Sequence, residues 1–166
     1  MARARRQAQR RETGVKGARI LVVEARFYED IADLLLRGAK RVLKEAGAVF
    51  DVVTVPGALE IPAAIMIAMH GAEARGAPYD GVVALGCVIR GETSHYDIVA
   101  GESARALMEI GIARRIPVGN GILTVDTAAQ AKVRAALDQG DKGGTAASAA
   151  LALVRLKRGN AARKPR

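Results

Sequence analysis

The chain has 166 residues, of which half are hydrophobic, and it contains one Cys, three Tyr, two Phe and no Trp. This length suits one domain with a sizeable core. The formal net charge is +9, but residues 1–17 carry +5 and residues 155–166 carry +6, which leaves −2 for the remainder. The body of the protein is therefore slightly acidic, and its composition does not favour a nucleic-acid-binding domain.

The two basic ends allow two interpretations. They could bind RNA, an anionic surface or a cargo, or they could be solvated tails that aid solubility. Neither end has the interleaved aromatic residues on which bases stack, so tails are favoured. We expect a disordered basic tail over residues 1–17, one domain over 18–157 and a second basic tail over 158–166.

Several classes of protein are excluded by simple counts. No apolar stretch approaches the roughly 20 residues of a membrane span, and the first residues lack the apolar core of a secretory signal. A single cysteine excludes an internal disulfide and indicates a reducing compartment, so we expect a cytoplasmic protein. The two histidines and the cysteine are too dispersed for a zinc site, and no metal is expected.

Strand and helix patterns alternate along the chain. Apolar runs of strand length occupy residues 19–25, 49–55, 81–89 and 117–125. Helical spacing, in some cases with a capping or terminating residue, is found over residues 30–46, 60–75, 95–115, 127–137 and 145–157. Asp30 is the expected cap of the first helix, and residues 139–144 are expected to form a flexible turn. The order predicts a three-layer α/β/α fold around a four-stranded, mainly parallel, doubly wound sheet.

The third strand and the loop that follows it are the most informative stretch. The run from Gly81 to Ile89 has no polar alternation, which is typical of a strand buried on both faces. It leads through a Gly-containing loop, residues 90–94, into a helix that begins near His95. Backbone N–H groups and the positive end of a helix dipole then meet at the carboxyl edge of the sheet, which predicts an anion site.

Three side chains at this edge each have two interpretations. His95 either takes part in chemistry or merely begins a helix. Phe27, in the loop 26–29, either stacks on a flat ligand or folds back on the core. Glu60, in the loop 56–60, either holds a ligand or complements the dipole of its own helix. No P-loop and no dinucleotide-binding glycine motif follows a strand, so a nucleotide cofactor is not expected.

Read together, these loops resemble a known family. Arg26-Phe27, the block 55–62 (VPGALEIP), the block 85–97 (LGCVIRGETSHYD) and Lys142-Gly143 closely resemble 6,7-dimethyl-8-ribityllumazine synthases, and the similarity runs from about Ala18 to Leu156. The resemblance implies a flavodoxin-like fold. It also implies condensation of 5-amino-6-(D-ribitylamino)uracil with 3,4-dihydroxy-2-butanone 4-phosphate, the penultimate step of riboflavin biosynthesis, without a cofactor.

The resemblance also implies roles for individual residues. His95 would move protons and Phe27 would stack on the pyrimidine. The remaining pyrimidine and ribityl contacts would come from Ala58, Leu59, Glu60, Cys87, Val88, Ile89 and Asn120. The butanone phosphate would be bound by Glu92, Thr93 and Arg134, with Arg90 and Lys142 as accessory residues. Departures from the family pattern are Asn120 in place of an aromatic residue, Tyr28 in place of Asn and Cys87 in place of Thr.

The family further implies an assembly. Its members form pentamers with sites between neighbouring subunits, some close into sixty-subunit shells, and riboflavin synthase is a candidate partner. From this we expect Asn120 to be donated by a neighbour, and Phe27, Glu60, His95 and Arg134 to come mainly from one chain. The alternative is a weakly active or inactive family member that serves as a flavin- or lumazine-binding or shell-forming protein.

Overall fold

The computed structural model describes residues 14–162, and these form a four-stranded sheet covered by helices on both faces. The strands are β1 (Arg19–Ala25), β2 (Val49–Val55), β3 (Gly81–Ile89) and β4 (Val118–Val125). Their order is β2-β1-β3-β4 and every pairing is parallel. The predicted doubly wound sheet is confirmed, with the first and third strands at its centre.

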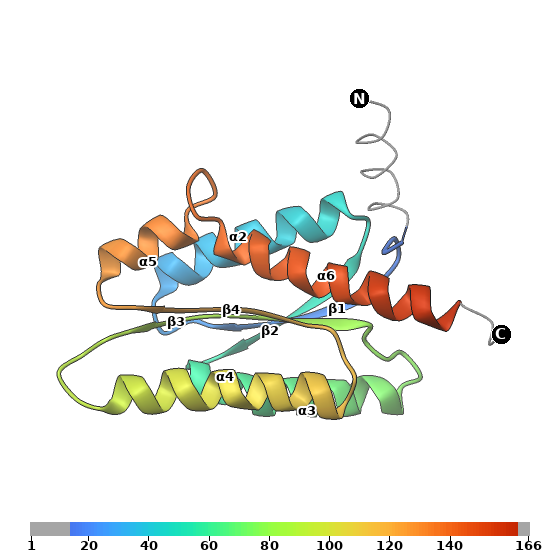
Figure 1. Cartoon of the computed structure of the whole chain (residues 1–166), viewed down its shortest axis with the longest axis horizontal. Coiled ribbons are helices and arrows are strands. Elements are labelled where there is room, and N and C mark those ends of the chain that lie inside the picture. Colours follow the sequence, from blue (N-terminus) through green and yellow to red (C-terminus); the bar gives the residue numbers. More distant parts are fainter. Residues whose placement is uncertain (1–13, 163–166) are drawn as a thin grey trace.

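The helices form the two outer layers (Figure 1). Helices α2 (Glu29–Glu45), α5 (Ala128–Ala135) and α6 (Lys142–Ala161) cover one face of the sheet. Helices α3 (Ile61–Ala74) and α4 (His95–Ala113) cover the other, and a short 3₁₀ turn, η1 (Ala58–Glu60), precedes α3. None of the helices within residues 14–162 is both long enough and apolar enough to cross a membrane.

The alternation of side chains along β1 explains how one sheet serves two cores. Ile20 and Val22 pack toward the layer of α2 and α6, whereas Leu21 and Val23 pack toward α3 and α4. All four are fully buried. Removing apolar side chains from water on both faces is the main favourable contribution to the stability of this architecture.

Helix α6 begins three residues earlier than predicted, so Gly143 and Gly144 belong to the helix and not to a turn. Asp141 caps the helix by accepting a hydrogen bond from the Gly144 N–H at 3.1 Å. A Cβ atom on Gly143 would collide with the backbone of Leu35 in α2. Gly143 therefore allows close packing of the two helices, and the flexible turn expected over residues 139–144 is wrong from Lys142 onward.

The first helix also begins differently. Tyr28 is the N-cap of α2, and its backbone oxygen accepts a hydrogen bond from the Ala32 N–H at 2.9 Å. The predicted cap, Asp30, lies within the first turn instead, where its charge complements the helix dipole.

The folded part of the chain extends beyond the predicted domain limits of 18 and 157. Val15 is fully buried, the Gly17 N–H donates to the Gly47 carbonyl at 2.8 Å, and Arg158 donates to the Lys16 carbonyl at 3.2 Å. The expected N-terminal tail is therefore wrong for residues 14–17, and α6 continues to Ala161. The rest of the two expected tails, residues 1–13 and 163–166, lies outside the described residues.

Because the segment before β1 packs on the domain, we expect Val15 to contribute to stability. Replacing Val15 by alanine is expected to lower stability by about 2 kcal/mol, because a fully buried Val side chain is shortened. For a domain of this size the melting temperature should fall by about 4–8 °C. Val133→Ala, at a position that is 52% exposed, is the matched control for thermal unfolding. Equal melting temperatures for the two variants would show that the segment contributes nothing.

Candidate active site

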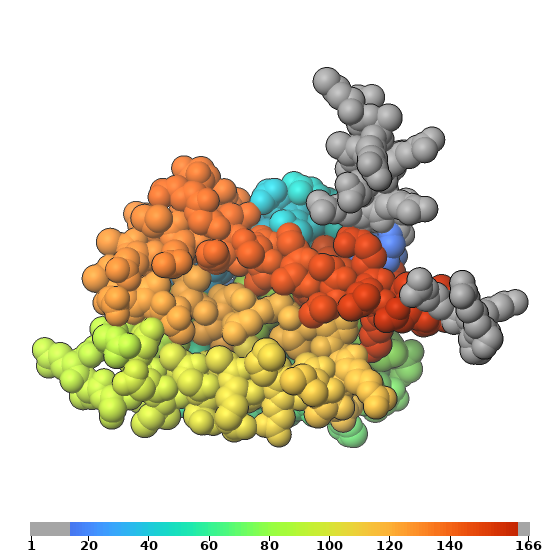
Figure 2. All heavy atoms as spheres, in the orientation of Figure 1, coloured from blue at the N-terminus to red at the C-terminus, as the bar shows by residue number. Residues whose placement is uncertain are grey.

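A pocket of about 440 Å³ lies at the carboxyl edge of β1, β2 and β3. Three loops enclose it, and they follow these three strands in the chain. The loop from β3 to α4 extends past the end of the sheet in Figure 1, and its atoms project beyond the neighbouring surface in Figure 2. Ligands of open parallel sheets bind at this edge, so the pocket is the candidate site.

The pocket brings together most of the residues that the sequence singled out. Its lining includes Phe27, Ala58, Leu59, Glu60, Cys87, Val88, Ile89, Thr93 and His95. Phe27 is 72% exposed, so it does not fold back on the core. Glu60 and His95 are also exposed. Glu92 lies in the same loop as Thr93, although it does not line the pocket.

Three helices begin at this pocket, and their N-termini lack side-chain caps within the described residues. The N-caps are Tyr28 for α2, Glu60 for α3 and Ser94 for α4. In contrast, α5 and α6 are capped by the side chains of Thr127 and Asp141. Each of these N-termini places a partial positive charge at the pocket. The His95 N–H of α4 donates to the Thr93 hydroxyl at 3.4 Å, and other first-turn N–H groups are left for a ligand. A ligand with oxygen acceptors or a phosphate would satisfy these groups.

Arg90 does not line the pocket but organises the loop that does. Its guanidinium lies over the ring of Tyr96, with the carbon 4.0 Å from the ring centroid. It also pairs with Asp97 at 3.4 Å and with Asp126 at 3.3 Å. These contacts join the β3–α4 loop to the first turn of α4 and to the end of β4. The geometry favours a structural role for Arg90 in holding this loop.

Cys87 lies in the wall of the pocket as a small apolar residue. Burial raises the pKa of its thiol to about 11, so the reactive thiolate is scarce at neutral pH. Within residues 14–162, no group of three or more His, Cys, Asp or Glu side chains is arranged to hold a metal ion.

The thiol therefore allows a chemical test. At pH 7.5, iodoacetamide should alkylate Cys87 in the folded protein at least about 100-fold more slowly than an ordinary cysteine, because the thiolate fraction is reduced. The same protein in guanidinium chloride is the control, read by mass spectrometry. Equally fast alkylation of the folded and unfolded protein would mean that burial does not suppress the thiolate.

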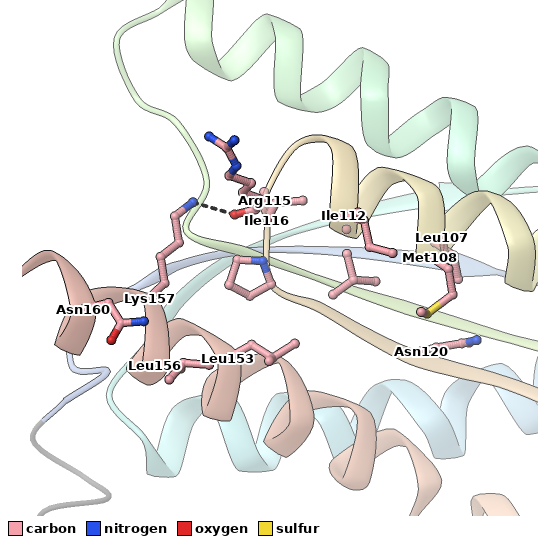
Figure 3. A pocket seen from close by; sticks show the side chains of 13 residues that line it. Leu107, Met108, Ile112, Arg115, Ile116, Asn120, Leu153, Leu156, Lys157 and Asn160 are labelled. Atoms are coloured by element: carbon pink, nitrogen blue, oxygen red, sulfur yellow. Dashed lines mark hydrogen bonds between the residues drawn. The ribbon is translucent and has the colours of Figure 1, made fainter.

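Three predicted residues lie elsewhere in the chain. Asn120 is on the edge strand β4, where its side-chain oxygen accepts a hydrogen bond from the Ile122 N–H at 2.9 Å. It lines a different, apolar groove between α4 and α6 (Figure 3). Arg134 on α5 is exposed and Lys142 begins α6, and neither lines the pocket. The structure thus does not bring Arg134 to the pocket of its own chain, in contrast to the expectation.

Other lining residues had no role assigned from the sequence. Tyr96 and Val99 of α4 line the pocket together with His95. Val99 lies one helical turn after His95 and Tyr96, so it faces the same side of the helix. This helical spacing could have identified Val99 as a pocket residue from the sequence. A second missed feature is Glu24, a charged residue inside the apolar run of β1, which is buried and bound to Arg26.

The pocket places this chain among the α/β enzymes that bind small molecules beyond the ends of parallel strands. The sequence profile of the 6,7-dimethyl-8-ribityllumazine synthase family matches residues 17–158. The chain therefore belongs to that family, an enzyme family of riboflavin biosynthesis, as its loops predicted.

Individual relatives support this assignment over nearly the whole chain. The 6,7-dimethyl-8-ribityllumazine synthase 1 of Rhodopseudomonas palustris is 61% identical over 158 residues, which cover 95% of this chain and 97% of the relative. The 6,7-dimethyl-8-ribityllumazine synthase of Azorhizobium caulinodans is 62% identical over 144 residues, covering 87% and 89%. The 6,7-dimethyl-8-ribityllumazine synthase 1 of Rhizobium meliloti is 61% identical over 143 residues, covering 86% and 94%.

Proposed function

We propose that the pocket at the carboxyl edge condenses 5-amino-6-(D-ribitylamino)uracil with 3,4-dihydroxy-2-butanone 4-phosphate to give 6,7-dimethyl-8-ribityllumazine. The amine of the pyrimidine attacks the ketone and forms an imine with loss of one water. Phosphate is then eliminated, and the second ring closes with loss of a second water. The family and the relatives' names support the reaction. The observation that carries the site assignment is the pocket ringed by three uncapped helix N-termini.

The pyrimidine binds along the inner wall of the pocket. Phe27 stacks on its ring, because an exposed aromatic side chain at the pocket mouth gains most by covering a flat ligand. The backbone of Cys87, Val88 and Ile89, at the end of β3, reads the polar edge of the uracil. The backbone of Ala58 and Leu59 and the Glu60 carboxylate hold the hydroxyl groups of the ribityl chain.

The phosphate of the butanone binds at the start of α4. The backbone N–H groups of Glu92 and Thr93, in the loop just before this 19-residue helix, bind the phosphate together with the positive end of the helix. A guanidinium is suited to a phosphate leaving group, and we assign this role to Arg134. Since Arg134 does not line the pocket of its own chain, it is supplied by a neighbouring subunit, with Lys142 nearby in sequence as an accessory cation.

His95 transfers protons between the reacting groups. Each step of the condensation moves a proton near neutral pH, where an imidazole exchanges protons readily. His95 is the first residue of α4 and lines the pocket between the two proposed substrate positions. Holding both substrates in one pocket supplies much of the remaining rate, because a bimolecular reaction becomes effectively unimolecular.

A direct assay tests the reaction. Purified protein mixed with both substrates should produce the absorbance and fluorescence of the lumazine, and each substrate alone should not. Protein-free solution at the same pH measures the uncatalysed rate. No rate above that background at high protein concentration would contradict the proposal.

We also propose that the chain assembles into a pentamer. Twelve such pentamers could close into a sixty-subunit shell, which is a further assembly to test. A groove of about 470 Å³ lies between α4 and α6 beside β4, and it is lined mainly by apolar side chains (Figure 3). Met108 is 65% exposed and Ile112 is 72% exposed, which an assembled neighbour would cover. A head-to-tail interface here would deliver Asn120 to the pocket of the next subunit.

Two further proposals concern the setting of the enzyme. The free, buried thiol of Cys87 suits a reducing compartment, and we place the enzyme in the cytoplasm. Riboflavin synthase, which acts on the lumazine, is proposed as a partner because of the family resemblance.

A further inference from the structure

Glu24 is a buried carboxylate that the mechanism above does not use. It lies in the apolar strand β1 and is 3% exposed. Burying a charged group is costly unless it is paired and hydrogen-bonded. A strand that needed only packing would carry an apolar residue at this position, so the partners of Glu24 indicate its purpose.

These partners belong to the elements that frame the pocket. Thr54 on β2, the residue opposite Glu24 in the sheet, donates its hydroxyl to the carboxylate at 3.0 Å. Arg26, two residues further along the chain, donates Nη1 to both carboxylate oxygens at 3.2 and 3.3 Å. The other end of the same guanidinium, Nη2, donates to Asp33 of α2 at 2.7 Å. Arg26 thus connects the end of the sheet with the first turns of α2.

Phe27 is held on both sides by this arrangement. The Arg26 N–H donates to the Val55 carbonyl at 3.1 Å, so the residue before Phe27 is fixed by backbone and side chain alike. The residue after it, Tyr28, begins α2 and meets the Phe27 ring edge to face, with the ring centroids 4.9 Å apart. The Phe27 side chain itself remains 72% exposed, so its orientation depends on these neighbours.

We propose that Glu24 is a positioning residue, which acts through Arg26 to hold Phe27 where it stacks on the pyrimidine substrate. The proposal rests on the stacking role of Phe27 in the proposed function. An aromatic ring fixed before the substrate arrives loses less conformational freedom on binding, so pre-organisation raises affinity. Asp33 keeps the Arg26 guanidinium in place from the helix side, and its hydrogen bond raises the pKa of Arg26, which stays charged.

Steady-state kinetics separate positioning from general stability. Glu24→Ala should raise KM for the ribitylaminouracil about tenfold, since charge-assisted hydrogen bonds are lost, and leave KM for the butanone phosphate within about twofold. Glu24→Gln keeps an oxygen acceptor and should restore most of the affinity. Asp33→Ala, at a side chain that is 62% exposed, removes the other anchor of Arg26 without opening the core and should raise the same KM. It therefore provides the test should Glu24→Ala not fold.

A second readout does not depend on activity. The chain has no tryptophan, so Phe27→Trp introduces a single fluorescent reporter at the pocket. Adding Glu24→Ala or Asp33→Ala should lower the anisotropy of this reporter and increase its quenching by acrylamide, whereas Glu24→Gln should change both less. Arg105→Gln, which breaks exposed ion pairs with Glu102 and Glu109 on α4, is the matched control and should change neither. A loosened reporter in an inactive protein would support the network while the proposed reaction fails.

Two results would overturn the proposal. One is an unchanged pyrimidine KM in a folded Glu24→Ala or Asp33→Ala variant whose reporter has become mobile, since ordering Phe27 would then bring no benefit to binding. The other is a reporter that stays as rigid as in the Phe27→Trp parent when either anchor of Arg26 is removed.

Discussion

Replacing His95 by alanine is expected to lower kcat by about 10- to 100-fold and to leave both KM values within about threefold. The imidazole lines the pocket as the first residue of α4, and its loss removes general acid–base help, which is commonly worth about 10²–10⁴-fold. The loss falls at the low end because amine and ketone are intrinsically reactive and the pocket still holds them together.

His70 provides the matched control for this variant. It is the other histidine of the chain and lies exposed on α3, outside the pocket. His70→Ala should retain the wild-type rate in the lumazine assay, and both variants should melt at wild-type temperature. A His95→Ala enzyme with unchanged kcat would remove His95 from the mechanism.

Replacing Arg134 by glutamine should reduce kcat/KM for the butanone phosphate by about 100-fold. The guanidinium is assigned to the phosphate leaving group, and loss of one such charge-assisted contact in a transition state costs about 2.7–4 kcal/mol. The affinity for the pyrimidine should remain unchanged. Lys132→Gln, two residues earlier on the exposed face of α5, is the control for a general change in charge. If Arg134→Gln matched Lys132→Gln, the phosphate would be bound elsewhere.

The strands could be predicted from the sequence because each is a mainly apolar run of strand length, and β3 is apolar throughout. The predicted bounds of β1, β2 and β3 agree with the structure. The start of α6 could not be predicted in the same way. In the sequence alone, Gly143 and Gly144 are typical of a flexible turn. In the structure, the close approach of α2 explains Gly143, and the capping carboxylate of Asp141 explains Gly144.

The residues of the pocket also differ in how far the sequence could predict them. Phe27, Glu60 and His95 follow three different strands, and parallel pairing is enough to bring the ends of those strands to one edge. The partners of Arg26 depend instead on the register of β1 with β2 and on the placement of α2, which the sequence does not specify. Arg134 does not line the pocket of its own chain, and this is why we propose that a neighbour supplies it.

In the proposed assembly, one chain provides the pocket with His95 while a neighbour completes it with Arg134. Co-refolding equal amounts of His95→Ala and Arg134→Gln chains tests this most directly. In randomly mixed head-to-tail rings, about one site in four joins an intact His95 chain to a neighbour with an intact Arg134. We predict that lumazine formation recovers to about a quarter of the wild-type rate, far above either variant alone. Activity no higher than the average of the two parent variants, in rings shown by mass spectrometry to be mixed, would contradict the shared site.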